Sequence, residues 1–309
     1  MEQLVKQLLE GDRRALARLL SIVEEQSPKA FDALELLWGK SQQAPSVGIT
    51  GPAGAGKSTL VDASIKHLRD QNKKVGVVAV DPTSPFTGGA VLGDRIRMQR
   101  HSGDENVYIR SMGSRGKTGG ISFATRAFIH ILSAFGLEEL MVETVGAGQS
   151  ETSVVEVVDT TVVVLVPEAG DAIQALKAGM LEIADVYVVN KKDRDGADQV
   201  VFDIESMLSM GSNKSAWQPK IIQTQATNGE GVDELWTAIE EHRVFLQQEQ
   251  KSEQEILRSR KRELRELLEM LLLYRTQNIL DNDKSLKEKL IQPKAPNLYM
   301  LASDLIKNI

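Results

Sequence analysis

Short apolar runs alternate with segments of helical period through the middle of the chain. The runs are rich in β-branched residues and occupy 47–50, 75–80, 140–143, 161–166, 186–190 and 221–224. Several are apolar throughout, as strands buried on both faces of a parallel sheet should be. Alternating strands and helices imply right-handed crossovers, which bring ligand chemistry to the carboxyl ends of the strands. The pattern therefore predicts an α/β domain with a mostly parallel central sheet over residues 45–245.

Both ends of the chain show helical spacing instead. In residues 1–44, leucines at positions 4, 8, 9, 16, 19 and 20 predict helices, with a break at Gly11-Asp12. An apolar stripe on a charged helix needs to be covered by other protein surface. The cover can be a partner or a second copy of the chain, or it can be the helix's own domain, and the pattern does not decide between these. Residues 246–309 show such a stripe among Arg, Lys and Glu, made of Ile256, Leu257, Leu264, Leu267, Leu268, Leu271 and Leu272.

The composition is that of an ordinary globular protein. Of 309 residues, 41% are hydrophobic and 26% are charged, which is enough for a full core. The net charge of −6 argues against nucleic acid as the main partner. The absence of cysteine excludes disulfides and thiolate metal ligands. No apolar run approaches the roughly 18 residues of a membrane span, and the N-terminus is too acidic for a signal peptide. We expect a cytoplasmic protein with no membrane partner.

One stretch matches a phosphate-binding loop. Residues 51–58 fit the P-loop pattern G-x-x-x-x-G-K-[ST], after a strand and before a helical pattern. The glycines let backbone N–H groups wrap around phosphate oxygens, and the next helix N-terminus adds partial positive charge. Lys57 reaches the β- and γ-phosphates, and the Ser58 hydroxyl ligates Mg²⁺. The predicted nucleotide contacts here are Gly51, Ala53, Gly54, Ala55, Gly56, Lys57, Ser58 and Thr59.

A second motif reads the base. Asn190-Lys191-Lys192-Asp193 follows the strand at 186–190 and fits the Asn-Lys-x-Asp pattern. The Asp193 carboxylate accepts both the ring N–H and the exocyclic amine of guanine, whereas adenine would leave this charge unpaired. Asn190, Lys191 and Asp193 are therefore predicted to select GTP and GDP. Gln225, Ala226 and Thr227 stand where related domains place a Ser-Ala loop under the base, and Gln225 departs from that pattern.

Acidic residues at strand ends complete a predicted magnesium site. Asp81 ends the strand at 75–80, Asp94 lies in the loop after it, and Glu143 ends the strand at 140–143. Each could be a plain helix cap. Together with Ser58 they offer the hard oxygen ligands that Mg²⁺ prefers, directly or through water. We also assign catalytic roles to Lys57, Asp81 and Glu143.

The expected turnover is slow. Ala147 occupies the position where efficient small GTPases carry a glutamine that orients the attacking water. Alanine cannot orient water, and Gln149 lies two residues further on. We therefore expect slow intrinsic hydrolysis, with a second group supplied by rearrangement or by a partner.

These motifs, in this order, resemble those of the MeaB/ArgK family of GTPases, which are bacterial relatives of the human cobalamin-A protein. The similarity covers nearly the whole chain, and 143–151 is its most specific part because ordinary GTPases do not continue in that way. The segments that carry the resemblance are 9–18, 51–59, 81–85, 93–98, 143–151 and 190–193.

The resemblance implies a GTPase chaperone for an adenosylcobalamin-dependent methylmalonyl-CoA mutase or a related acyl-CoA mutase. Such a protein gates cofactor loading and protects the mutase from inactivation. The resemblance also implies a homodimer held by the C-terminal helical arm. Residues 166–177 are similar to the third switch of the family, which responds to the mutase, so Gln174 and Lys177 are assigned catalytic roles there. Ala172 stands where the family usually has an acidic residue.

Two other functions are less compatible with the sequence. The first is an ATP-dependent kinase or transport ATPase, a label that this family has carried. ATP offers no partner for Asp193, so this reading is disfavoured. The second is a nickel-insertion GTPase of the same superfamily. Such proteins carry metal on cysteine and histidine clusters, which this chain lacks.

Overall fold

A seven-stranded parallel sheet forms the centre of the molecule among the residues that this computed structural model describes, which are 1–25, 27–40, 42–81, 99–101, 103–113, 118–144, 157–167, 180–210, 216–249, 253–291 and 297–306. The strand order is β3-β2-β4-β1-β5-β6-β7, and every neighbouring pair is parallel. The strands are β1 (Ser46–Thr50), β2 (Val75–Asp81), β3 (Val107–Gly113), β4 (Glu139–Thr144), β5 (Thr160–Leu165), β6 (Val186–Asn190) and β7 (Lys220–Thr224). The predicted α/β fold with a parallel sheet is confirmed.

Strand β3 is absent from the sequence prediction, and its place in the sheet explains why. Among the described strands it lies at the edge of the sheet and pairs with β2, and its middle residues are half-buried. Arg110 interrupts the apolar run, and its guanidinium bonds to the carboxylate of Glu24 at 2.9 Å. A half-polar edge strand lacks the continuous apolar run that identifies the central strands.

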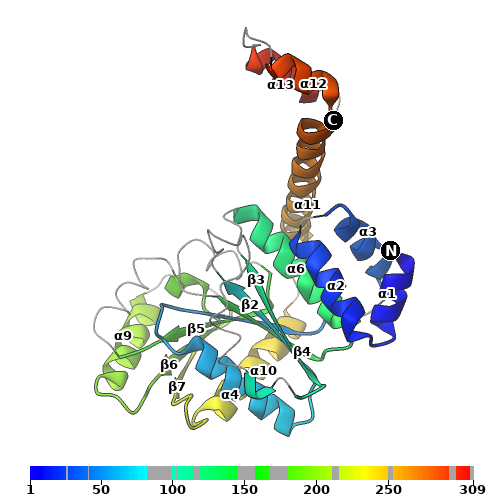
Figure 1. Cartoon of the computed structure of the whole chain (residues 1–309). Coiled ribbons are helices and arrows are strands. Elements are labelled where there is room, and N and C mark those ends of the chain that lie inside the picture. The colour runs from blue at the N-terminus through cyan, green and yellow to red at the C-terminus, as the bar shows by residue number, and fades with distance from the viewer. Residues whose placement is uncertain are drawn as a thin grey trace.

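Helices cover both faces of the sheet (Figure 1). On one face lie α4 (Lys57–Asp70) and α10 (Val232–Gln248), which bury alternate side chains of the central strands. On the other face lie α6 (Thr118–Ala134) and α9 (Ala197–Met210). Short 3-10 helices occupy Gln99–His101 and Met180–Ile183. This three-layer arrangement buries β1, β4, β5 and β6 completely, as their apolar composition requires.

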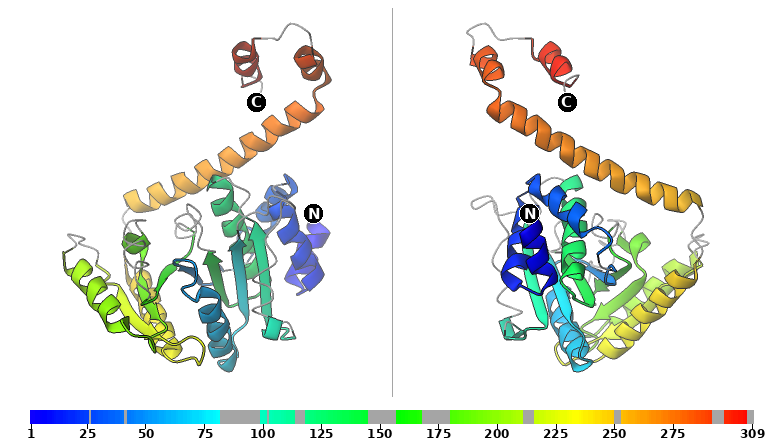
Figure 2. Two further views of the ribbon diagram at one scale, coloured as in Figure 1. Left: turned by 60° about the vertical axis from the view of Figure 1, so that its left-hand side comes forward. Right: turned by 90° about the vertical axis from the view of Figure 1, so that its right-hand side faces the viewer.

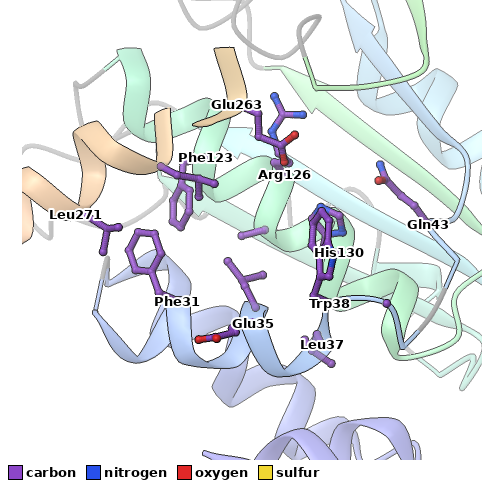
Figure 3. A pocket seen from close by; sticks show the side chains of 14 residues that line it. Phe31, Glu35, Leu37, Trp38, Gln43, Phe123, Arg126, His130, Glu263 and Leu271 are labelled. Carbon is purple, nitrogen blue, oxygen red and sulfur yellow. The ribbon is translucent and has the colours of Figure 1, made fainter. Parts of the chain in front are cut away.

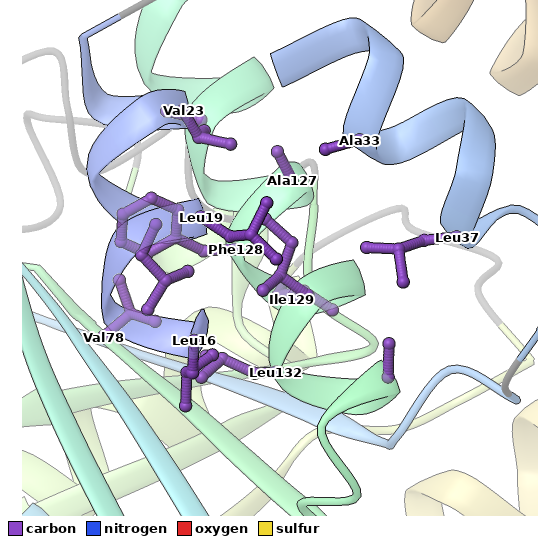
Figure 4. Close-up of a cluster of buried hydrophobic side chains, with 14 of the residues drawn as sticks. Leu16, Leu19, Val23, Ala33, Leu37, Val78, Ala127, Phe128, Ile129 and Leu132 are labelled. Carbon is purple, nitrogen blue, oxygen red and sulfur yellow. The ribbon is translucent and has the colours of Figure 1, made fainter. Parts of the chain in front are cut away.

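Three N-terminal helices pack on the α6 side of the sheet. They are α1 (Glu2–Leu9), α2 (Arg13–Glu24) and α3 (Lys29–Leu37). The predicted break between the first two is present, because Gly11 is left-handed (φ +87°) and the Asp12 carboxylate caps α2 by accepting from the Arg14 N–H at 2.6 Å. Figure 4 shows Leu19 of α2 and Phe128 of α6 meeting in the shared core.

A long C-terminal arm extends beyond the domain. It consists of α11 (Glu253–Asn282), α12 (Lys284–Ile291) and α13 (Leu298–Ile306). Figure 2 shows α11 running over the domain towards the side of the N-terminal helices, with α12 and α13 held above the domain. No helix within the described residues combines the length and the apolar character needed to cross a bilayer.

The two sides of α11 have different environments. Met270 is buried against the domain core, Leu267 packs beside it, and Glu266 lies 3.6 Å from Arg126 of α6. Other leucines of the same helix remain exposed, including Leu257, Leu264, Leu268 and Leu272. The helix therefore folds back on its own domain along one side and leaves an apolar stripe uncovered along another.

A buried histidine lies at the amino-terminal edge of the sheet, away from the strand ends that carry the motifs. His242 of α10 is only 3% exposed, and its Nδ1 lies 2.9 Å from the Thr160 hydroxyl. Its Nε2 lies 3.4 Å from Asp185. Burial lowers the pKa of His242 to about 4, with Asp159 opposing this shift and Arg243 adding to it. Burial raises the pKa of Asp185 to about 6.

We expect His242→Gln to change how stability depends on pH. The unfolded histidine binds a proton near pH 6.5 and the folded one near 4, so this group costs stability as pH falls between these values. Asp185 acts in the opposite direction, because its folded carboxyl binds the proton more tightly. Between pH 7 and 4.5 the variant should lose less unfolding free energy than the wild type, by up to about 3 kcal/mol. Urea unfolding at both pH values measures this, and parallel profiles would contradict it.

Candidate nucleotide site

The sequence motifs meet at the carboxyl edge of the sheet. The P-loop follows β1, and α4 begins at Lys57 directly after it. Glu143 lies at the end of β4, which neighbours β1, and Asn190 ends β6. Since parallel strands all end at one edge, segments far apart in the sequence converge at the N-terminus of α4. Backbone N–H groups at a helix N-terminus favour anions, so this edge suits a phosphate.

Two glycines of the P-loop occupy positions that a side chain could not share. Gly51 has φ +142°, and a Cβ there would lie 2.1 Å from the Val164 carbonyl oxygen. Gly56 has φ +88°, and its Cβ would lie 2.4 Å from the Asn190 amide nitrogen. The loop is thus pressed against β5 on one side and the end of β6 on the other. This close packing explains why the pattern requires glycine at both ends.

Lys57 is the charged centre of this loop. Its side chain is buried, and Nζ donates to the carbonyl oxygens of Gly51 at 2.7 Å and Pro52 at 2.9 Å. These contacts hold the ammonium group along the inside of the loop. A cation fixed there can compensate the negative charge of a phosphate without packing in the hydrophobic core.

Ser58 and Glu143 are joined across the site. The Ser58 hydroxyl donates to Glu143 Oε1 at 2.6 Å, and both side chains are buried. Nearby, at the ends of β4 and β1, the Thr144 hydroxyl donates to the Thr50 hydroxyl at 2.9 Å. The two threonines were missed by the sequence prediction, although polar residues that end apolar strands were the available signal. The pair ties the end of β4 to the start of the P-loop.

The donor set at this point fits a hard cation. A hydroxyl and a carboxylate oxygen meet at the N-terminus of α4, which is the chemistry that Mg²⁺ prefers. Asp81 ends β2, which lies between β3 and β4, and its backbone is in register with Gly113 of β3. Within the described ranges no group of three or more Asp, Glu, His or Cys side chains converges. The predicted ligand Asp94 lies outside these ranges, as do Gln174, Lys177, Ala147 and Ala172.

Asn190 connects three segments of the site. Its amide Nδ2 donates to the Ala55 carbonyl of the P-loop at 2.9 Å. Its Oδ1 accepts from the Thr224 hydroxyl and from the Ala226 backbone N–H, both at 3.1 Å. The side chain is buried, so these bonds are shielded from water. The phosphate-binding loop and the two loops predicted to hold the base are therefore fixed relative to one another.

The remaining base-motif residues lie at the surface of the same edge. The backbone of Lys191 has a left-handed conformation (φ +60°), and the Asp193 side chain is exposed. Lys192 forms an ion pair with Glu230 at 2.7 Å, which links the motif to the turn after β7. In that turn Gln225 Oε1 accepts from Asn228 at 3.1 Å, so its side chain is engaged locally. Thr227 is exposed beside it. The contribution of Glu230 was missed, because a lone glutamate gives no sequence signal.

Comparison with known proteins agrees with this geometry. The family described as "Methylmalonyl Co-A mutase-associated GTPase MeaB" matches residues 16–280. A protein of Pyrococcus horikoshii, provisionally named as a GTPase, is 51% identical over 251 residues, covering 80% of this chain and 79% of that protein. GTPase ArgK of Escherichia coli is 36% identical over 250 residues, covering 78% and 76%.

A relative from mouse and a solved structure are similar to this chain as well. The mouse methylmalonic aciduria type A homolog, a mitochondrial protein, is 35% identical over 259 residues, covering 78% of this chain and 62% of that protein. Among solved structures, an LAO/AO transport system kinase superposes with a TM-score of 0.67 at 28% identity, covering 93% of this chain and 88% of that one. The span that the family matches runs from α2 to the last turn of α11 and includes the P-loop and the Asn-Lys-x-Asp motif. The chain therefore belongs to the MeaB family of GTPases.

Proposed function

We propose that this protein binds Mg²⁺-GTP, hydrolyses it to GDP and phosphate, and acts as a cytoplasmic chaperone. Its client is an adenosylcobalamin-dependent methylmalonyl-CoA mutase or a related acyl-CoA mutase, whose cofactor loading it gates. The observation that carries the proposal is the link that Asn190 makes between the P-loop and the loop after β7. This link sets a phosphate site and a base site at a fixed spacing.

In this proposal the phosphates lie in the P-loop. The backbone N–H groups of 53–59 face the phosphate oxygens at the start of α4. Lys57 exchanges its bonds to the Gly51 and Pro52 carbonyls for bonds to the β- and γ-phosphates. The two carbonyls hold the ammonium group in the loop until a phosphate takes their place.

Ser58, Asp81, Asp94 and Glu143 would hold Mg²⁺, which neutralises charge on the β- and γ-phosphates when bound. The Ser58 hydroxyl donates its proton to Glu143, so the lone pairs of its oxygen would remain available to the metal. Glu143 orients the ligand as well as adding negative charge.

Asp193 reads guanine through two accepted hydrogen bonds, and the Asn190 bonds hold its loop in place. Ala226 contributes through its backbone, which is already fixed by Asn190. Gln225 and Thr227 lie in the same turn. The engaged side chain of Gln225 supports a role in shaping this turn.

The test of the whole proposal is single-turnover GTP hydrolysis with and without purified methylmalonyl-CoA mutase. The isolated protein should be slow, well below about 10 per second, because Ala147 leaves no water-orienting amide. The mutase should accelerate it, by an effect that is worth about three to five orders of magnitude in other GTPases. Gln174→Ala or Lys177→Ala should reduce that acceleration more than the basal rate. A fast free protein, or equal loss of both rates, would contradict the proposal.

The proposed homodimer rests on the exposed leucines of α11. Leu264→Glu combined with Leu268→Glu should give a monomer in light scattering with unchanged GTP binding, because both side chains face solvent in the single chain. Charge substitutions are a cleaner test than removing the arm, since removal would strip Met270 from the domain core. Phe202→Glu, at an exposed position of α9, is the matched control and should stay dimeric. An unchanged dimer in the double variant would refute this interface.

A further inference from the structure

Lys192 occupies the position of the Asn-Lys-x-Asp motif that the pattern leaves free. Its Nζ lies 2.7 Å from Glu230 Oε2, which joins the motif to the turn after β7. The backbone N–H of Lys192 also donates to the Thr224 carbonyl at 3.0 Å. The side chain and the backbone of one residue therefore both hold the motif against the end of β7 and the turn that follows it.

Glu230 is fixed by its own turn as well as by Lys192. Its Oε1 accepts from the Asn228 amide at 3.1 Å, and its Oε2 faces Lys192. Its backbone N–H donates to Asn228 Oδ1 at 3.1 Å, and its carbonyl accepts from the Gln225 N–H at 3.0 Å. The hydrogen bond from Lys192 and the charge of this lysine lower the pKa of Glu230. Since the carboxylate is already held in place, pairing costs little further side-chain entropy.

The motif and the turn after β7 are linked at two depths. The Asn190 side chain, which is 3% exposed, bonds to Thr224 and Ala226 inside the edge of the sheet. The pair of Lys192 and Glu230 lies nearer the surface, with side chains 33% and 53% exposed. A single buried link lets the outer part of a loop pivot, and a second link nearer the surface restricts this movement. Asp193, which follows Lys192 directly, lies in that outer part.

The grip on a base depends on these two loops, because the apolar groove of the domain lies elsewhere. That groove, of about 820 Å³, is formed between α3, α6 and α11. Figure 3 shows Phe31 and Phe123 stacked within it, with ring centroids 5.2 Å apart. The described residues that line it include none from 190–193 or 225–230. The spacing of the two loops therefore decides how well a base is held at the nucleotide edge.

We propose that Lys192 is a positioning residue for guanine selectivity, because its pair with Glu230 holds the Asp193 carboxylate where it accepts both donors of guanine. The inference rests on the proposed function and adds a residue that the base motif leaves unspecified. Two hydrogen bonds to one carboxylate require both oxygens to be aligned, whereas one bond tolerates a tilted loop. Loss of the pair should therefore weaken binding of a base with two donors more than binding of a base with one.

GDP and IDP compare these two cases. Hypoxanthine, the base of IDP, lacks the exocyclic amine and offers Asp193 only the ring N–H. We expect Lys192→Met to lower GDP affinity roughly two- to five-fold, which is the range of a partly exposed ion pair, and to leave IDP affinity nearly unchanged. Lys192→Arg keeps a cation that can bond to a carboxylate and should keep the wild-type ratio of the two affinities. Calorimetric titration at low salt measures this ratio.

Two controls separate the pair from the general charge of this edge. Glu230→Gln should lower the ratio of GDP to IDP affinity as Lys192→Met does. Glu234→Gln removes the same charge from an exposed position in the first turn of α10 and should keep the wild-type ratio. In about 1 M salt the wild-type ratio should fall towards that of Lys192→Met, because salt screens a partly exposed pair.

Two results would overturn the inference and leave the proposed function standing. The first is a Lys192→Met protein that keeps the wild-type ratio of GDP to IDP affinity. The second is an equal loss of affinity for GDP and IDP, which would show that the pair supports the fold of the edge and not the reading of the base. A wild-type protein that binds ADP as tightly as GDP would contradict the base motif itself, and the role of Lys192 with it.

Discussion

Lys57→Ala should abolish GTP hydrolysis and lower GTP affinity by roughly two to four orders of magnitude. This fall in affinity corresponds to the loss of two charge-assisted contacts to phosphate, which contribute about 1.5–3 kcal/mol each. The fold should survive, because the bonds from Nζ to the backbone carbonyls of Gly51 and Pro52 stay within its own loop. Calorimetric titration with GTP and thermal unfolding measure the two quantities separately.

A second lysine on the same helix provides the control. Lys66 lies nine residues along α4 and is exposed. Lys66→Ala removes the same charge from the same helix without touching the P-loop. We expect its GTP affinity and turnover to match the wild type. Hydrolysis at the wild-type rate by Lys57→Ala would show that residues 51–59 are not the phosphate site.

Asp193→Asn should convert guanine selectivity into xanthine selectivity. The asparagine cannot accept both guanine donors, and its amide can instead donate to the additional carbonyl of xanthine. We expect GDP affinity to fall by roughly 100-fold or more, from the loss of hydrogen bonds to a charged acceptor, and XDP affinity to rise. Calorimetry with GDP, ADP and XDP on both proteins measures the change.

Asp195 tests whether the effect belongs to one carboxylate or to the charge of the loop. It is exposed two residues further along the same turn. Asp195→Asn should keep the nucleotide preference of the wild type. Equal affinity of the wild-type protein for ADP and GDP would contradict the assignment of 190–193 as the base-reading motif.

The nucleotide edge of the sheet was largely readable from the sequence. The glycine spacing of the P-loop reflects the positive φ angles of Gly51 and Gly56, which other residue types rarely adopt. The central strands were found because burial on both faces demands continuous apolar runs. The break before α2 was found because Asp12 caps a helix at a left-handed glycine. Each of these is a local constraint, so a local pattern records it.

Other features depend on contacts between distant segments, and no local pattern records them. The edge strand β3 is half-polar because α2 supplies the partner of Arg110. Asn190 could be placed in a base motif, but its bond to Ala55 depends on a contact 135 residues away. The same holds for the Thr50–Thr144 pair and for His242 beside Thr160.

The C-terminal arm combines a feature set by neighbouring residues with one set by contacts between distant segments. Helical spacing alone predicted α11 and its leucines, because the period of a helix is a property of neighbouring residues. Which leucines contact the domain depended on where α6 lies, and the tertiary structure placed Met270 inward and Leu268 outward. The sequence pattern did not decide between packing on the chain's own domain and packing on a partner. An apolar stripe shows that a helix face is buried by something, but it does not identify what buries it.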